Sequence, residues 1–295
     1  MELIKNTNFN FMGKRKIFYC FSLLIIILGI SFMIIKGEKN FGVDFVGGDL
    51  INIEFSQKID VASLRRIIAQ ENIGSFTVQE LGVEGKNYII RLPQKTSDLI
   101  LERLKNNFGE NFTVKRKSII SPSMSISLRK KAIKAFLIGL ICILIYLTIR
   151  FEFKFAVGAV VALFHDILVV LSILVISGKQ IDGMVIAALL TIIGYSVNDT
   201  VVVFDRIREN ARKTRTTDYI ALFNKSINET LSRTILTGLT TIFVVLCLFF
   251  LGGETLHTFS FCLLIGIIFG TYSSIFIASA IIIDWLKRSN VRLKI

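Results

Sequence analysis

Two ionisable side chains stand in or beside long apolar stretches of this sequence, where a charge is costly. Asp199 lies within an apolar stretch at residues 183–203, and Arg233 just precedes another at residues 235–251. A charge inside a membrane helix costs roughly 2.5–3.5 kcal/mol on insertion scales, so each such residue needs a reason. Loss of water favours a neutral carboxyl, whereas a nearby guanidinium favours the carboxylate. A small movement of Arg233 would then make Asp199 bind or release a proton.

The residues alone leave a second interpretation of this pair open. Asp199 and Arg233 could form a static buried ion pair, or Asp199 could lie close enough to the membrane surface to stay hydrated. Asp199 does lie in the second half of its apolar stretch. For His165 and Asp166 a structural role is favoured over a functional one: we expect them to pack or to join a polar network.

Polar and small residues recur at helical spacing in the same stretches. At about 100° per residue, a first polar stripe with Asp199 on its flank comprises Thr191, Tyr195 and Asn198. A second stripe begins at Arg233 and continues through Thr237 and Thr240. We expect both stripes to face the interior of a helix bundle. In the last apolar stretch, Gly266, Gly270 and Ser274 repeat every four residues, which predicts close helix packing.

The composition predicts a membrane protein with several spans. Hydrophobic residues make up 53% of the chain, the mean hydropathy is +0.64, and only 19% of residues are charged, against about 25% in soluble domains. The net charge of +13 is attributed to basic residues that flank membrane spans. It is not attributed to nucleic-acid binding, because no basic run alternates with stacking aromatics.

The sequence predicts neither a metal site nor a cofactor site. All four cysteines lie inside apolar stretches and none lies in the long polar segment after the first, so neither a disulfide framework nor a metal-binding spacing is available there. There is also no Gly-x4-Gly-Lys-Ser/Thr loop for a nucleotide.

Six apolar stretches approach the length of about 20 residues that a bilayer core requires. They run over residues 17–35, 132–149, 155–177, 183–203, 235–251 and 258–283. Lysine and arginine gather before the first, between the second and third, between the fourth and fifth, and after the sixth, which predicts that both termini are cytoplasmic. Only the basic cluster at residues 129–134 opposes this orientation. It follows a long exported segment, where the charge rule is weak.

The polar segment at residues 37–128 is therefore expected to form an extracytoplasmic domain. Strand and helix patterns alternate over residues 49–55, 61–70, 76–81, 87–92, 98–108 and 112–117, with Ser97 as the expected cap of the second helix. This βαββαβ order predicts a small α+β, ferredoxin-like fold. The expected division is thus residues 1–36 (tail and first span), 37–128 (domain), 129–286 (five spans) and 287–295 (tail).

Four segments together resemble a known family. They are GVDFVGG at residues 42–48, SVNDTVVVFDRIREN at 196–210, SRT at 232–234 and GTYSS at 270–274. The chain closely resembles the SecF family, membrane subunits of the SecD–SecF protein-export complex. The glycine-rich segment carries the signature residues Gly42, Asp44, Gly47 and Gly48. Gly238 departs from the pattern, which has a small hydroxyl residue there.

The resemblance implies one half of an RND-like transporter core in the cytoplasmic (inner) membrane, with SecD as the other half and SecYEG as the associated channel. It implies that the proton gradient drives late steps in the export of a polypeptide in transit. It assigns the intramembrane acid of the family to Asp199 and its arginine to Arg233. Two other possibilities remain at this stage: an RND-type exporter of a lipid or small amphiphile, and a scaffold that transports nothing. An enzyme is least favoured.

Overall fold

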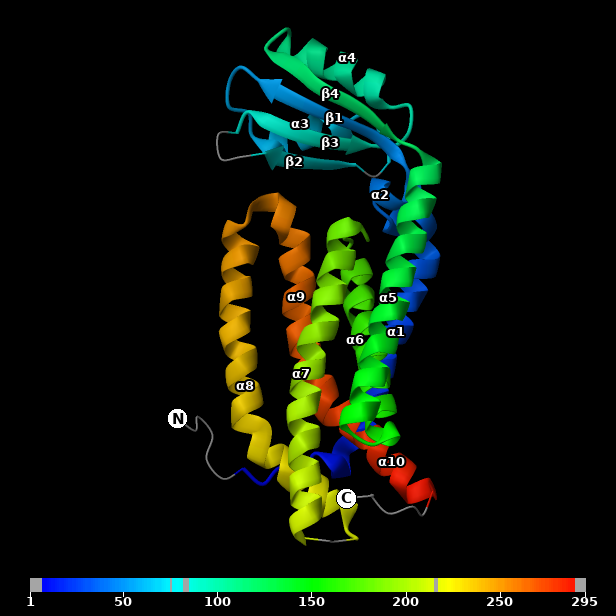
Figure 1. Cartoon of the computed structure of the whole chain (residues 1–295). Coiled ribbons are helices and arrows are strands. Elements are labelled where there is room, and N and C mark those ends of the chain that lie inside the picture. Colours follow the sequence, from blue (N-terminus) through cyan, green and yellow to red (C-terminus); the bar gives the residue numbers. More distant parts are fainter. Residues whose placement is uncertain (1–6, 75, 82–84, 215–216, 290–295) are drawn as a thin grey trace.

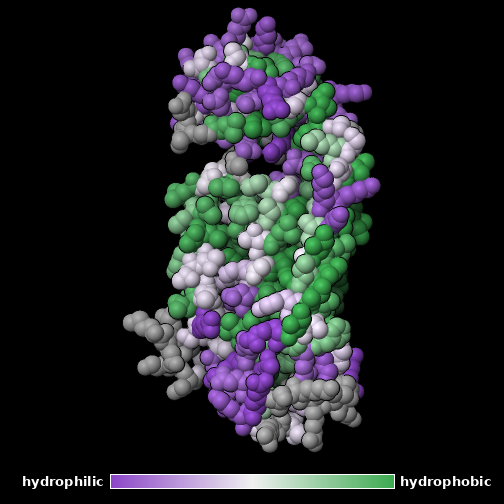
Figure 2. All heavy atoms as spheres, in the orientation of Figure 1, coloured by the Kyte–Doolittle hydropathy of each residue, from purple (hydrophilic) through white to green (hydrophobic). Residues whose placement is uncertain are grey.

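Six long helices form most of the molecule (Figure 1). The computed structural model describes residues 7–74, 76–81, 85–214 and 217–289. The long helices are α1 (Arg15–Lys36), α5 (Pro122–Arg150), α6 (Phe153–Ile176), α7 (Gly183–Thr214), α8 (Tyr219–Leu251) and α9 (Gly253–Ser273). Their apolar surfaces form a broad band below a polar head (Figure 2). The prediction of six membrane spans in a helical protein is confirmed.

Helices α7 and α8 extend well beyond the apolar stretches that predict them. The expected spans cover residues 183–203 and 235–251, yet α7 continues to Thr214 and α8 already begins at Tyr219. The polar extensions stay helical because one face of each is buried, through Phe204 and Ile207 on α7 and Phe223 on α8. Arg233 consequently lies inside a helix and not at its start.

The sixth span is not one regular helix. A π-helix at Ser274–Ala278 follows α9 directly, and α10 (Ser279–Ser289) completes the span. Ser279 Oγ donates to the carbonyl of Ser274 at 3.0 Å, which bridges the wider turn. Single π-helical turns inside α-helices frequently occur at functional sites.

The head lies at one end of the bundle and contains a four-stranded antiparallel sheet. Its elements are β1 (Gly48–Phe55), α3 (Val61–Ala69), β2 (Thr77–Leu81), β3 (Asn87–Leu92), α4 (Ser97–Phe108) and β4 (Phe112–Ile120), with the strand order β2-β3-β1-β4. Alternate residues of β1, including Ile51 and Ile53, are buried against α3 and α4. The α+β prediction is thus confirmed. The expected Ser97 cap was wrong: Ser97 begins α4, and its N–H donates to the Asp49 carboxylate at 3.1 Å.

A short junction connects the head to the loop between α6 and α7. It includes α2 (Val43–Val46). Backbone bonds join Gly42 N–H to the Ile181 carbonyl at 2.9 Å and Ile181 N–H to the Asn40 carbonyl at 2.7 Å. Gly183 N–H, at the first residue of α7, donates to the Asp44 carboxylate at 3.2 Å. The first residue of α7 is therefore hydrogen-bonded to the base of the head.

The signature glycines of this junction have steric reasons. Gly47 has φ +90°, a conformation that residues with a Cβ rarely adopt. A Cβ on Gly48 would lie 2.3 Å from the carbonyl oxygen of Leu92.

Burial raises the pKa of Asp182 in the same junction, and the nearby Asp44 raises it further. The folded chain therefore binds a proton at Asp182 more tightly than the unfolded chain does. The resulting stabilisation of the fold is present at low pH and is lost as the pH rises through the elevated pKa of Asp182.

Gly48→Ala is expected to weaken the end of the β1–β3 pair. The clash is with backbone, which cannot move aside as a side chain can, and overpacking of this kind typically costs about 1–3 kcal/mol. Hydrogen–deuterium exchange of the full-length chain should show faster exchange at the start of β1 and the end of β3. Gly139→Ala on α5, where a Cβ meets nothing within 4 Å, is the control. Unchanged exchange in Gly48→Ala would contradict the steric argument.

Candidate functional site

The carboxylate of Asp199 is buried between two membrane helices, α7 and α9. It lies on α7 with an exposed fraction of only 2%, and its Oδ2 accepts a hydrogen bond from Thr271 Oγ1 of α9 at 3.1 Å. The close approach of α9 depends on Gly270, where a Cβ would lie 3.1 Å from the Cβ of Ser196 on α7. Because Gly270 has no side chain, α9 packs closely enough on α7 for the Thr271 hydroxyl to donate to Asp199.

Arg233 is near Asp199 but does not form an ion pair with it. The guanidinium lies on an exposed part of α8, and no nitrogen–oxygen distance of 4.0 Å or less joins the two residues among the ion pairs of the described chain. Its charge still acts on the carboxylate through space. A static buried ion pair is therefore not the arrangement in this structure.

The two polar stripes only partly face the interior of this chain. Tyr195 is half-buried, and its hydroxyl lies beside α8, where a Cβ on Gly238 would be 3.9 Å away. The side chains of Thr191, Asn198, Arg233 and Thr240 are exposed instead. Thr237 is partly buried and donates back to the carbonyls of Arg233 and Thr234 on its own helix. The expectation that both stripes point inward was thus wrong for most of their members.

The buried face of α7 is rotated relative to the expected stripe. It runs through Ile192, Ser196, Asp199 and Val203, so Asp199 belongs to this face and Asn198 does not. The small residues of the sixth span pack on the same face. Gly266 lies against Ile192, Gly270 lies against Ser196, and Ser274 Oγ is 2.7 Å from Thr200 Oγ1.

Asp166 lies in a second buried polar cluster, which we call the Asp166 cluster: His165, Asp166, Ser196 and Ser273. Asp166 is 1% exposed. Its Oδ2 accepts from Ser196 Oγ at 2.6 Å and from Ser273 Oγ at 2.8 Å, and its Oδ1 lies 3.1 Å from His165 Nδ1. His165 and Asp166 thus join a polar network. The sequence patterns point to neither serine as a partner, because the donors come from two other helices.

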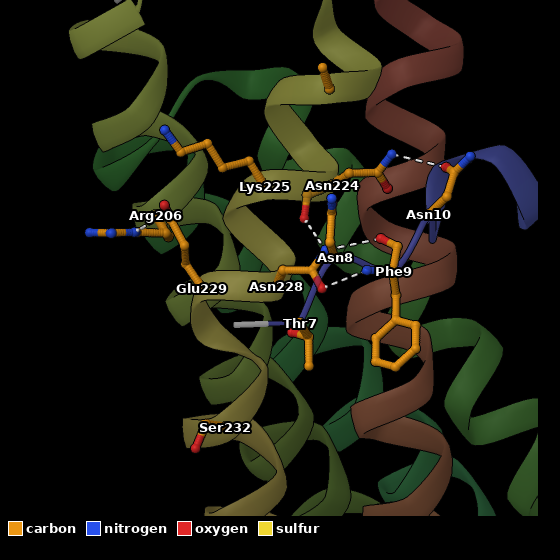
Figure 3. Close-up of a pocket in the computed structure, with 11 residues that line it drawn as sticks. Thr7, Asn8, Phe9, Asn10, Arg206, Asn224, Lys225, Asn228, Glu229 and Ser232 are labelled. Carbon is orange, nitrogen blue, oxygen red and sulfur yellow. Dashed lines mark hydrogen bonds and ion pairs between the residues drawn. The ribbon is translucent and has the colours of Figure 1, made fainter. Parts of the chain in front are cut away.

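A pocket of about 920 Å³ lies between α7, α8 and the segment before α1 (Figure 3), at the end of the bundle opposite the head (Figure 1). Asn224 and Asn228 of α8 hold the chain at Asn10 and Phe9 there. On the other side, Arg206 of α7 donates to Glu229 of α8 at 2.7 Å. Among the described residues, no group of three or more His, Cys, Asp and Glu side chains is placed to hold a metal ion.

Six spans, an α+β head and buried carboxylates define a polytopic helical membrane protein with polar groups inside its bundle. A family model described as protein export membrane protein SecD/SecF, C-terminal, matches residues 100–288. The chain belongs to the SecD/SecF family of protein-export membrane proteins, which gives it a role in Sec-dependent export.

Full-length relatives are SecF subunits. The chain is 44% identical over 301 residues to protein translocase subunit SecF of Thermodesulfovibrio yellowstonii, and the match covers 99% of each chain. It is 38% identical over 288 residues to SecF of Rickettsia prowazekii, covering 95% of this chain and 92% of the relative. It also superposes on the crystal structure of SecDF, a translocon-associated membrane protein from Thermus thermophilus. The TM-score is 0.80 at 36% identity, over 98% of this chain and 40% of the SecDF chain.

Proposed function

We propose that this chain works with SecD in the Sec translocase and uses the proton gradient to promote late steps of protein export. The observation that carries the proposal is the environment of Asp199. Its carboxylate is buried among membrane-spanning helices, accepts a hydrogen bond from Thr271, and has no ion pair within 4.0 Å among the described residues. A carboxylate in such surroundings gains stability by binding a proton.

In this proposal the head lies outside the cytoplasm and both termini lie inside. The helix ends opposite the head carry basic residues, among them Arg15 at the start of α1, Arg150 at the end of α5 and Arg206 in the last turns of α7 (Figures 1 and 2). Lysine and arginine favour the cytoplasmic side of a membrane. The loop between α8 and α9, at the head end, has neither residue.

The proton acts by changing the contacts of α7. Protonation removes the attraction of Asp199 for Arg233 and changes its hydrogen bond with Thr271. A shift of α7 then reaches the head, because Gly183 at the other end of that helix is hydrogen-bonded to Asp44. One charge that moves through 100 mV releases about 2.3 kcal/mol, enough to bias a two-state step by tens of times.

The exposed polar residues of α7 and α8 support a partner in the membrane. Polar side chains that face lipid are costly, yet Thr191, Asn198 and Thr240 are exposed on this chain. A second helical half that covers them would remove this cost. The SecDF crystal structure supports the same idea, since this chain spans only 40% of it.

Co-purification from gently solubilised membranes tests the partnership. We expect a SecD chain to travel with this one, and Thr191→Trp to reduce the amount recovered several-fold, because a large ring at an exposed position of α7 would block the approach of the second half. Leu24→Trp, at an exposed apolar position of α1, is the matched control. Equal recovery with both variants would mean that this face of α7 does not contact SecD.

A further inference from the structure

The Asp166 cluster lies where three membrane helices meet, and the proposed role of Asp199 makes no use of it. Each contact of the carboxylate comes from a different helix: His165 from α6, Ser196 from α7 and Ser273 from α9. Asp166 and Ser273 are essentially inaccessible to solvent. A carboxylate at this depth is costly to keep, and packing alone would be served as well by an apolar residue.

His165 supplies a second, independent observation. The ring is more than nine-tenths buried, with 8% exposed, and its Nε2 has no hydrogen-bond partner among the described residues. A neutral imidazole that donates from Nδ1 to Asp166 leaves a lone pair on Nε2. The pair then carries one net negative charge inside the bundle, and one added proton would neutralise it.

We propose that His165 and Asp166 form a second proton-binding site within the membrane bundle. One proton binds to the pair, at Nε2 or at a carboxylate oxygen, and changes its net charge from −1 to zero with no other reactant. The cluster suits a proton better than a metal cation because O–H groups already donate to Oδ2 and a ring nitrogen faces Oδ1.

Few other titratable groups face the pair. The ring of Tyr272 on α9 lies against His165 with centroids 6.1 Å apart, and its hydroxyl donates to the Phe18 carbonyl of α1. Asp199 is on α7, three residues beyond Ser196. Among the described residues, no Lys or Arg forms an ion pair with Asp166 within 4.0 Å, and no other carboxylate forms one with His165.

The two carboxylates are connected through one turn of α9. Thr271 donates to Asp199, and Ser273, two residues further on, donates to Asp166. The π-helix begins at the next residue, so this turn lies beside the least regular part of the span. A proton on one carboxylate therefore changes the hydrogen bonds of the turn that serves the other. This link to export rests on the proposed function, whereas the proton site itself does not.

The chain has 2 histidines, which makes the site directly measurable. The full-length chain is labelled with ¹⁵N-histidine and placed in lipid bilayers, and His257→Gln leaves His165 as the single imidazole signal. We expect the ¹⁵N shift of this signal to change with pH, with a midpoint where the pair takes up its proton. In Asp166→Asn this midpoint should move, because the carboxylate that shares the proton with His165 is lost. Asp205→Asn, at an exposed carboxylate of α7, should leave the midpoint unchanged.

A double-variant comparison tests the connection through α9. Asp199→Asn should shift the His165 midpoint, and the shift should disappear when Ser273→Ala is combined with it. A proton on either residue changes the hydrogen bond between His165 Nδ1 and Asp166 Oδ1, so a His165 ¹⁵N shift that does not change with pH would overturn the proposal. A midpoint that moves when sodium replaces potassium at constant ionic strength would overturn it as well. The proposed function fails separately, if Asp199→Asn retains export driven by the gradient.

Discussion

Asp199→Asn is expected to abolish the stimulation of export by the proton gradient while the chain still assembles with SecD. The amide has nearly the shape of the carboxyl and can still accept from Thr271, which donates to Asp199 at 3.1 Å, but it can neither bind nor release a proton. Because one charge moved through 100 mV is worth about 2.3 kcal/mol, the loss should reach a factor of about fifty. Export of a reporter protein into membrane vesicles, with and without an imposed gradient, measures it.

A matched control separates this effect from a general loss of negative charge. Asp205 lies on the same helix, is exposed, and pairs with Arg150 at 3.2 Å. Exposed ion pairs contribute only about 0–1 kcal/mol, so Asp205→Asn should export almost normally. Undiminished gradient-driven export by Asp199→Asn would remove this carboxyl from the mechanism and would favour a scaffold that transports nothing.

Arg233→Lys gives a graded test of the same mechanism. Lysine keeps the positive charge on α8, and the effect of Arg233 on Asp199 acts through space and not through a close ion pair. We therefore expect the lysine variant to retain much of the gradient-driven export and Arg233→Gln to lose most of it. Equal activity of the two variants in the vesicle assay would mean that the charge at this position is not needed.

The sequence was sufficient to predict the number of spans and the α+β head. These features follow from local periodicity, which depends on neighbours in the chain. The orientation of the polar stripes was not predictable in the same way. Asn198 and Asp199 are adjacent in sequence, yet Asn198 is exposed and Asp199 is buried, because the buried face of α7 is decided by where α9 packs.

The contacts of the Asp166 cluster were likewise not predictable from local periodicity. His165 and Asp166 stand out in the sequence, but Ser196 and Ser273 are ordinary helix residues until the tertiary fold brings them to one carboxylate. The π-helix at Ser274–Ala278 has no marker in the hydropathy pattern either. A regular apolar span is the natural expectation for residues 258–283, since no proline interrupts the stretch.

Gly29→Ala is expected to be the most damaging small substitution in the bundle, at a glycine that the sequence patterns do not single out. Gly29 is buried in α1, where a Cβ would lie 2.1 Å from the Cβ of Ser172 and 2.4 Å from its Cα on α6. The Cα belongs to the backbone, so no rotamer change relieves the clash and the two helices must separate. Overpacking of this kind costs about 1–3 kcal/mol or more.

The expected result is a lower unfolding temperature and a smaller yield of folded protein, measured on the purified full-length chain by thermal unfolding in detergent. Gly139→Ala on α5 adds the same methyl group where nothing lies within 4 Å, and it should be neutral or slightly stabilising, since alanine is the better helix former. Because α1 leads into the base of the head, separation from α6 should also speed amide exchange around Asn40, whose carbonyl accepts from Ile181 N–H at 2.7 Å. If Gly29→Ala matched Gly139→Ala in both measurements, α1 and α6 would not pack as closely in the membrane as they do here.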